Sequence, residues 1–193
     1  PQRRMACRLP QHPGAFHTLA GKRVGIVGLG RIGSRVARRL AAWECESVFH
    51  DIRSFDDEYL RACGARPVPF DALLATSDIV TLHVPLNHTT RHLVGRRALG
   101  LMRPESMLIN TCRGSVVDEA ALINALQEKR LGGAGLDVFE VEPIALDNQL
   151  LQLPGVVLTP HLATMSPDSG PAGTQHAVTN TARVALGQAP TSV

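Results

Sequence analysis

Long hydrophobic runs and paired cysteines are both missing from this chain of 193 residues. No apolar run approaches the roughly 18 residues of a membrane-spanning helix, and the first residues lack the apolar stretch of a signal peptide. Cys7, Cys45, Cys63 and Cys112 show no paired spacing, which predicts free thiols rather than disulfides or a metal site. We therefore expect a protein of the reducing cytoplasm, with neither a membrane nor a metal among its partners.

Acidic residues are also missing from the N-terminal region, where none precedes Glu44. Nine basic residues occupy the same stretch: Arg3, Arg4, Arg8, Lys22, Arg23, Arg31, Arg35, Arg38 and Arg39. A nucleic-acid surface would account for this charge, but no aromatic stacking platform accompanies the arginines. We expect no nucleic-acid partner, because steering of an anionic cofactor or an ordinary solvated helix face also explains the basic residues.

The hydrophobic content of 44% and the charged content of 19% are typical of one globular domain with a single core. From Gly21 onward, short apolar runs alternate with segments of helical periodicity. The expected strands are Arg23–Val27, Ser47–His50, Asp78–Val84, Ser106–Asn110, Ala134–Val138 and Val156–Thr159. Strands that alternate with helices predict an α/β fold, a Rossmann-type doubly wound parallel sheet covered on both faces.

Two helices are marked clearly by the sequence. Ile32, Val36 and Leu40 recur at helical spacing and share one face of the first of them. Asp118 is placed to cap the second, whose end we expect at Gly132-Gly133.

The segment from Val24 to Gly33 is typical of a strand, a tight glycine turn and a helix start. Gly28 allows the turn, Gly30 lets backbone approach a pyrophosphate, and Gly33 lets the helix pack close to the sheet. The N–H groups and the positive dipole end of the helix then hold the phosphates. Asp51 follows the next strand, where its carboxylate accepts the ribose hydroxyls. Glycine spacing alone also fits a merely structural turn, but the strand and the acid together predict a dinucleotide site.

Cofactor choice depends on the same acidic residue. Asp51 would repel the 2′-phosphate of NADP, which favours NAD. Arg53 is the exception, because an arginine near this position accommodates that phosphate.

Three polar side chains follow later strands, at the edge where doubly wound sheets bind ligands. Arg113 offers a bidentate fork for the carboxylate of a 2-oxo acid. His161 protonates the oxygen that becomes an alkoxide, and Glu142 beside it favours the charged imidazolium. Each residue alone fits a surface ion pair or a loop position equally well, so the prediction depends on their joint placement.

The motifs together closely resemble the D-isomer-specific 2-hydroxyacid dehydrogenases, from roughly Leu19 to His161. The resemblance lies in the glycine loop and in three segments, Asn110–Glu119, Leu136–Pro143 and Thr159–His161. This family includes D-3-phosphoglycerate dehydrogenase, hydroxypyruvate and glyoxylate reductases, D-lactate dehydrogenase and phosphite dehydrogenase. The resemblance implies an NAD-dependent oxidoreductase that acts on a small 2-hydroxy or 2-oxo acid, and it implies a homodimer.

The resemblance also implies roles for individual residues. Arg113, Glu142 and His161 match the catalytic arginine, glutamate and histidine, the glutamate being the one before Pro143 and not Glu140. Asp137 matches the aspartate that contacts the nicotinamide carboxamide, and residues 83–86 match the loop that passes under the cofactor. The full set of expected cofactor contacts is Gly28, Gly30, Arg31, Ile32, Gly33, Asp51, Arg53, His83, Val84, Pro85, Thr111, Cys112, Arg113, Asp137 and His161.

The chain departs from the family in its domain organisation. Family members carry a substrate domain, most of which precedes the cofactor domain, and most of it is absent here. We expect residues 1–20 to be a leader from that domain, 21–165 the NAD-binding domain, and 166–193 a helical segment that returns toward the substrate domain. A fragment of a normal enzyme explains this better than a naturally shortened protein that binds nucleotide without turnover.

Three smaller departures concern two single positions and one short segment. Glu44 stands where the family usually has glycine at a left-handed helix end, so we expect the local turn to differ. Cys112, beside Arg113, is potentially oxidisable. Residues 166–173 interrupt the helical pattern before it resumes at Thr174–Leu186, because they contain two glycines and two prolines.

Two other functions remain open on the sequence. A corepressor of the C-terminal-binding-protein type would use NAD(H) to control assembly without turnover, and Ser166–Ser169 faintly resembles that branch. A methyltransferase that binds S-adenosylmethionine would share the glycine loop and the acid, but it leaves Arg113, Glu142 and His161 unexplained. The substrate is not readable from this chain, and phosphoglycerate is expected only as a common family substrate.

Overall fold

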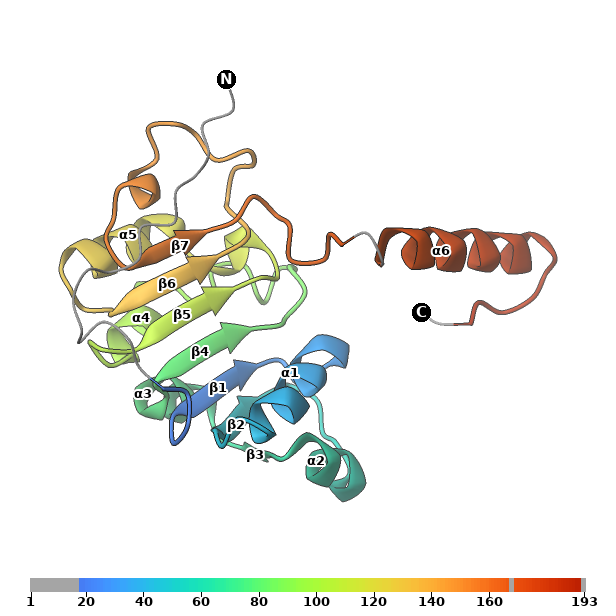
Figure 1. Cartoon of the computed structure of the whole chain (residues 1–193), viewed down its shortest axis with the longest axis horizontal. Helices are drawn as coiled ribbons and strands as arrows, with labels where there is room; N and C mark the ends of the chain where they lie inside the picture. Colours follow the sequence, from blue (N-terminus) through green and yellow to red (C-terminus); the bar gives the residue numbers. More distant parts are fainter. Residues whose placement is uncertain (1–17, 167–168, 192–193) are drawn as a thin grey trace.

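A computed structural model of the chain describes residues 18–166 and 169–191 (Figure 1), so most of the expected leader, with Cys7, lies outside the described residues. One sheet of seven parallel strands forms the centre of the fold, in the order β3-β2-β1-β4-β5-β6-β7. The strands are β1 (Arg23–Val27), β2 (Glu46–His50), β3 (Ala65–Pro67), β4 (Ile79–Leu82), β5 (Met107–Asn110), β6 (Gly133–Leu136) and β7 (Val156–Leu158). The α-helices are α1 (Arg31–Ala41), α2 (Asp57–Cys63), α3 (Phe70–Thr76), α4 (Arg96–Leu101), α5 (Glu119–Gln127) and α6 (Ser169–Ala185). The predicted doubly wound parallel sheet is confirmed.

The order of the strands locates the ligand-binding edge. The chain runs from β1 outward to β3 and then returns to place β4 on the other side of β1. Ligands of such sheets bind at the carboxyl ends of the strands where the order reverses, which here lies between β1 and β4. All six expected strands are present, and β3 is an additional strand that the sequence did not indicate.

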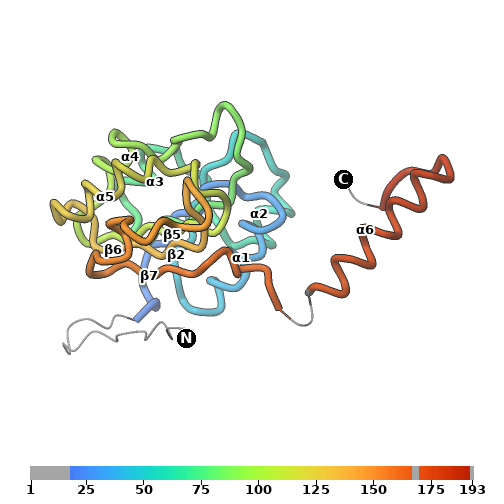
Figure 2. The backbone as a smooth tube through the Cα atoms, turned by 90° about the horizontal axis from the view of Figure 1, so that it is seen from above, coloured from blue at the N-terminus to red at the C-terminus, as the bar shows by residue number. Residues whose placement is uncertain are grey.

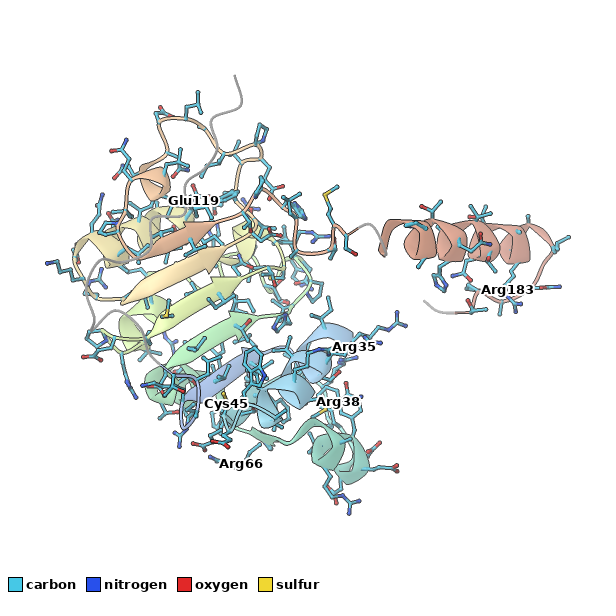
Figure 3. The ribbon with its side chains drawn as sticks, in the orientation of Figure 1. Arg35, Arg38, Cys45, Arg66, Glu119 and Arg183 are labelled. Atoms are coloured by element: carbon cyan, nitrogen blue, oxygen red, sulfur yellow. The ribbon has the colours of Figure 1, made fainter. Side chains whose placement is uncertain are left out.

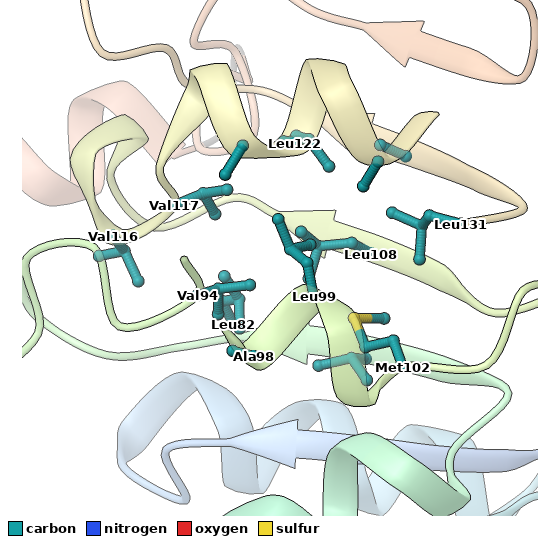
Figure 4. Packing of buried hydrophobic residues seen from close by; sticks show 14 of the residues in the cluster. Leu82, Val94, Ala98, Leu99, Met102, Leu108, Val116, Val117, Leu122 and Leu131 are labelled. Atoms are coloured by element: carbon teal, nitrogen blue, oxygen red, sulfur yellow. The ribbon is translucent and has the colours of Figure 1, made fainter. Parts of the chain in front are cut away.

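Helices lie on both faces of the sheet (Figure 2), and each face has its own hydrophobic cluster. The larger cluster joins α3, α4 and α5 to the sheet, and Figure 4 shows Leu99 of α4 and Leu122 of α5 meeting over Leu108 of β5. The smaller cluster joins α1 and α2 to β1 and β2 through side chains such as Ile26 and Phe49.

The second face is covered only in part by the described residues. Helices α1 and α2 pack near β1, β2 and β3, whereas Met107 of β5 and Val157 of β7 are 39% and 62% exposed. Ile109 pairs with Gly135, which pairs with Val157, so Met107, Ile109 and Val157 point to this same face. Helices thus lie on both faces as expected, but no described helix covers the end of this face that β5, β6 and β7 form.

Helix α1 lies so close to the sheet that only small side chains fit beneath it. Gly33, Ser34 and Ala37 are its buried residues, whereas Ile32 is 59% exposed. Ile32, Val36 and Leu40 share one face of the helix as expected, but the residues that pack closest to the sheet are the small ones, and a β-carbon on Gly33 would already overlap the carbonyl of Gly28. Figure 3 shows Arg35 and Arg38 on the outer side of this helix, as a solvated helix face predicts.

The turn after α1 keeps the left-handed conformation despite its glutamate. Glu44 has φ 59°, and its carbonyl accepts a hydrogen bond from the N–H of Gly21 at 3.0 Å. The expectation that this turn differs is therefore wrong. A non-glycine residue in this region costs about 1 kcal/mol, which the hydrogen bonds and packing of the turn offset.

Helix α5 begins as predicted and ends earlier than expected. The carboxylate of Asp118 accepts the N–H of Ala121 at 2.9 Å, which confirms the N-cap. The helix ends at Gln127, and Lys129 takes the left-handed conformation with φ 55°, so Gly132-Gly133 is not the terminator. Gly133 is instead the first residue of β6.

Helix α6 is one continuous helix and stands apart from the sheet (Figure 1). The expected interruption at Gly170-Pro171 and Gly173 is wrong, because these residues lie in the first turns of the helix. A proline in the first turn costs no hydrogen bond, since the first four N–H groups of a helix have no partner within it. Neither α6 nor any other described helix has the length and apolar character needed to cross a membrane.

Candidate cofactor and active site

The glycine turn between β1 and α1 has the geometry of a phosphate cradle. Gly28 has φ 92°, and a β-carbon there would lie 2.5 Å from the carbonyl oxygen of His83. Gly30 caps α1 without a side-chain hydrogen bond, which leaves the N–H groups of the first turn directed at the strand ends. A dinucleotide pyrophosphate fits this cradle, because added side chains at Gly28 and Gly33 would fill or distort it.

Asp51 lies at the end of β2, beside the glycine turn. One carboxylate oxygen accepts the N–H of Leu29 at 2.7 Å, and the other accepts the N–H of Arg53 at 2.9 Å. Tyr59 donates its hydroxyl to the Leu29 carbonyl at 3.0 Å and so fixes the same turn from α2. The acid is therefore held against the glycine loop, in the position from which a carboxylate reaches the ribose of a dinucleotide.

The segment His83-Val84-Pro85 follows β4 and lies against the glycine turn. The N–H of His83 donates to the carbonyl of Val27 at 2.8 Å, and its ring Nε2 lies 3.0 Å from the hydroxyl of Thr81. Burial lowers the pKa of His83 from 6.5 to about 4, so this ring is neutral at neutral pH. A neutral ring beneath the turn adds no charge next to the expected phosphates.

Arg113 projects from the loop after β5, and a buried amide shapes that loop. Asn110 donates from Nδ2 to the carbonyl of Arg113 at 3.0 Å and accepts the N–H of Cys112 at 3.1 Å. Arg113 itself is exposed, with Nη1 donating to the carbonyl of Cys112 at 2.6 Å. Asn110 is thus a residue whose role the sequence did not reveal, although a polar side chain at a strand end was the available signal.

Glu142 and His161 form a hydrogen-bonded pair. Nδ1 of His161 lies 2.8 Å from one oxygen of Glu142, and the other oxygen accepts the N–H of Phe139 at 3.0 Å. Because a carboxylate can only accept, Nδ1 carries the proton and Nε2 is left for a reaction partner. The hydrogen bond from His161, the Phe139 N–H and the charges of His161 and Arg113 together hold the pKa of Glu142 below its usual range. The three residues expected to act together are therefore neighbours.

Asp137 organises the loop that carries His161. Its carboxylate accepts hydrogen bonds from the Thr159 hydroxyl at 2.5 Å and from the N–H groups of Leu162 and Ala163 at 2.8 and 2.9 Å. Its carbonyl accepts the N–H of His161 at 2.8 Å. Burial raises the pKa of Asp137, but the hydrogen bonds outweigh burial and leave this pKa below its ordinary value. The sequence motif gave no indication of this second role.

The loops of Arg113 and Glu142 approach each other closely at the backbone of Gly114 and Phe139. A β-carbon on Gly114 would overlap the carbonyl of Phe139, whose N–H holds Glu142. Glu140, two residues before Glu142, pairs with His92 at 2.5 Å instead of His161. The distinction between the two glutamates that the sequence comparison implied is thus visible in their partners.

The remaining expected cofactor contacts surround this edge. Thr111, Arg31 and Ile32 are exposed beside it, and Cys112 is half-buried. Burial raises the pKa of the Cys112 thiol, which disfavours the reactive thiolate, and the oxidation of Cys112 stays a prediction.

With this geometry in place, comparisons with known proteins decide the family. Residues 4–163 match the profile described as D-isomer specific 2-hydroxyacid dehydrogenase, NAD binding domain. The chain belongs to this family. It is 48% identical over 147 residues to a glyoxylate reductase of Korarchaeum cryptofilum, covering 76% of this chain and 44% of that protein. It is 41% identical over 181 residues to a glyoxylate reductase of Thermococcus litoralis, covering 93% and 54%.

A solved structure gives the same result. The crystal structure of a glyoxylate reductase from Paecilomyes thermophila superposes with a TM-score of 0.81 at 36% identity, covering 86% of this chain and 50% of that one. The chain thus spans about half the length of these relatives. The part that it covers is their NAD-binding domain. These relatives are reductases, and nothing in them supports the corepressor or methyltransferase alternatives.

Proposed function

We propose that the protein carrying this domain transfers hydride between NAD(H) and a small D-2-hydroxy acid or 2-oxo acid. The supporting observation is the 2.8 Å hydrogen bond between Glu142 and His161, next to the charge of Arg113, at the sheet edge beside the glycine turn. A cation for a carboxylate and a proton donor for an oxygen are what reduction of a 2-oxo acid requires.

Each residue has a defined task in this proposal. Arg113 binds the substrate carboxylate through its guanidinium fork and orients the neighbouring carbonyl. NADH held by the glycine turn and Asp51 would supply the hydride for the carbonyl carbon. His161 gives the proton on Nε2 to the carbonyl oxygen, which yields the hydroxy acid, and Glu142 stabilises the charged ring before this transfer. The reverse reaction returns the proton to Nε2.

The substrate class follows from relatives rather than from this chain. Glyoxylate is named for the relatives in Korarchaeum, Thermococcus and Paecilomyes, and glyoxylate and hydroxypyruvate for one in Enterobacter agglomerans, which favours these two substrates over phosphoglycerate. A panel of 2-oxo acids presented to the full-length protein with NADH measures this preference directly.

The two glutamates provide a matched test. Glu142→Gln keeps the shape of the side chain but removes the charge beside His161, so we expect kcat to fall by about 10- to 100-fold with a changed pH profile. Glu140→Gln makes the same chemical change two residues away, on a side chain that pairs with His92, and should leave kcat within about twofold.

His161→Ala completes the test, since it should abolish turnover while NADH binding persists. Equal losses in the two glutamine variants, or unchanged turnover in His161→Ala, would contradict the assignment. Retained NADH binding in all three variants shows that the domain is folded.

We also propose the domain limits, assembly and location expected from the sequence. The NAD-binding domain would comprise 21–165, with 1–20 and 166–193 contributing to a substrate domain, and the protein would be a cytoplasmic homodimer. Free Cys45, Cys63 and Cys112 support a reducing compartment. Sedimentation of the full-length protein tests the dimer, and a monomer would refute it.

A further inference from the structure

Glu142 lies on a connecting segment that has no helix or strand of its own. This segment, residues 140–148, lies between β6 and the short helix η3 (Gln149–Leu151). Ile144 packs against the larger hydrophobic cluster, whereas Val141 and Leu146 are 71% and 95% exposed. The direction of the Glu142 carboxylate therefore depends on where the two ends of the segment are anchored.

The carboxylate of Glu119, the first residue of α5, binds both ends of this segment (Figure 3). Its Oε2 accepts the backbone N–H of Glu140 at 3.2 Å, and its Oε1 accepts Nδ2 of Asn148 at 2.7 Å. The Asn148 side chain in turn accepts the N–H of Leu150 at 2.9 Å and so caps η3. The half-buried Glu119 thus ties the segment to the start of α5 on either side of Glu142.

The two contacts require a carboxylate at this position. Both partners are donors, and a carboxylate offers two acceptor oxygens where a carboxamide offers one. The first turn of α5 favours the negative charge, because the N-terminus of a helix is its positive end. Since Glu119 binds the segment before and after Glu142, its effect on His161 passes through the segment.

We propose that Glu119 is a positioning residue for the reaction, which holds the segment so that the Glu142 carboxylate lies beside Nδ1 of His161. That carboxylate is held at 2.8 Å from Nδ1 and at 3.0 Å from the N–H of Phe139, so a displaced segment breaks both contacts. The inference rests on the proposed function, because it gives Glu119 a task in the same proton transfer. Glu140 contributes its backbone N–H to this anchor, which Glu140→Gln retains.

Exchanging donor and acceptor between Glu119 and Asn148 tests the anchor. Glu119→Gln leaves one acceptor oxygen for two donors, and Asn148→Asp alone places two carboxylates at hydrogen-bond distance. The double variant, Glu119→Gln with Asn148→Asp, restores both contacts. Its new amide donates to the new carboxylate, and the amide oxygen still accepts the N–H of Glu140. The new carboxylate also keeps the N–H of Leu150 as a partner.

The pKa of Glu142, followed by NMR of its carboxyl carbon in this chain, reports the position of the segment without turnover. The hydrogen bond from His161 is the main cause that holds this pKa below its usual range. We expect each single variant to raise the pKa of Glu142 toward its ordinary value and the double variant to return it to the wild-type value. Glu128→Gln is the matched control, because Glu128 lies at the other end of α5 and pairs with Arg130.

Turnover of the full-length protein adds a kinetic readout. Loss of a hydrogen bond to a charged group should lower kcat of Glu119→Gln by about tenfold. The KM for the 2-oxo acid should stay within about twofold, since Arg113 still binds the carboxylate. The double variant should recover most of the lost kcat. A merely structural role would lower stability in urea and leave the pKa of Glu142 unchanged.

The outcomes separate this inference from the proposed function. An unchanged pKa of Glu142 in Glu119→Gln protein whose full-length form is active overturns the inference alone. A double variant as impaired as the single variants, or an equal change in Glu128→Gln, also overturns it, as does a raised pKa with unchanged kcat. Wild-type full-length protein that reduces no 2-oxo acid refutes the proposed function and, with it, the task given to Glu119.

Discussion

Gly33→Ala tests whether the close approach of α1 to the sheet creates the cofactor site. The added β-carbon would lie less than 3.0 Å from the backbone of Gly28 and 3.2 Å from the Ile26 side chain. Carbon–oxygen contacts are normally about 3.3 Å or longer, so the helix must move by an ångström or so. We therefore expect both the stability of the domain and the shape of the phosphate cradle to change.

The expected size follows from two opposing effects. Overpacking of this kind costs about 1–3 kcal/mol, and the rigid backbone neighbour places Gly33 at the upper end of that range. Alanine is a better helix former than glycine by up to about 1 kcal/mol, which offsets part of the cost. A net loss of about 2 kcal/mol corresponds to a Tm lower by about 4–8 °C in a domain of this size.

Gly100→Ala is the control, because Gly100 lies in α4 with no atom near its missing β-carbon. It should leave stability unchanged or raise it by up to about 1 kcal/mol, with NADH affinity intact. Urea unfolding followed by circular dichroism gives both stabilities, and NADH titration gives the effect on the cradle. Gly33→Ala protein that is as stable as Gly100→Ala protein and binds NADH equally well would refute the reasoning.

Three further perturbations act elsewhere in the domain. Gly114→Ala should lower the free energy of unfolding by about 2 kcal/mol and weaken the Glu142–His161 pair, because its β-carbon overlaps the Phe139 carbonyl; urea unfolding and the pH titration of the His161 ring by NMR check this. Asp118→Ala should cost about 1 kcal/mol in urea unfolding by removing the cap of α5, and Asp118→Asn should recover most of it. Stability should fall as pH decreases from 6.5 to about 4, by up to about 3 kcal/mol, since unfolded His83 binds a proton before folded His83 does. His83→Asn should show a smaller fall over the same pH range.

Each of these has a result that would contradict it. Wild-type stability in Gly114→Ala protein would mean that the two loops are not in backbone contact. An equal loss in Asp118→Asn and Asp118→Ala would exclude the cap. An identical pH dependence with and without His83 would show that other groups cause the acid instability.

The sequence predicted the fold well where hydrophobic runs are long. β1 and its neighbours in the middle of the sheet are buried on both faces, so they appear as continuous apolar segments. β3 was missed because it has three residues, of which only Ala65 is buried. The end of α5 was misplaced because Lys129 adopts a left-handed conformation that no lysine signals in a sequence.

The site was predictable to the extent that strand ends converge. Parallel strands place their carboxyl ends at one edge, so Asp51, Arg113 and His161 had to lie on the same side of the sheet. The hydrogen bonds that orient them were not predictable, because they join loops distant in the chain. Asp137 and Leu162 are 25 residues apart, and only the tertiary structure brings the carboxylate to that N–H.

Asp137 links the two halves of the proposed chemistry. Its carbonyl and carboxylate hold the segment from His161 to Ala163, so the position of the proton donor depends on this one buried acid. The family resemblance assigns the same carboxylate to the nicotinamide carboxamide. If both roles hold, a cofactor that hydrogen-bonds to this carboxylate also affects the hydrogen bonds that position the loop of His161. Hydride donor and proton donor would then be aligned by a common hydrogen-bond acceptor, and Asp137→Asn should impair cofactor binding and kcat together, whereas Glu142→Gln should affect kcat alone.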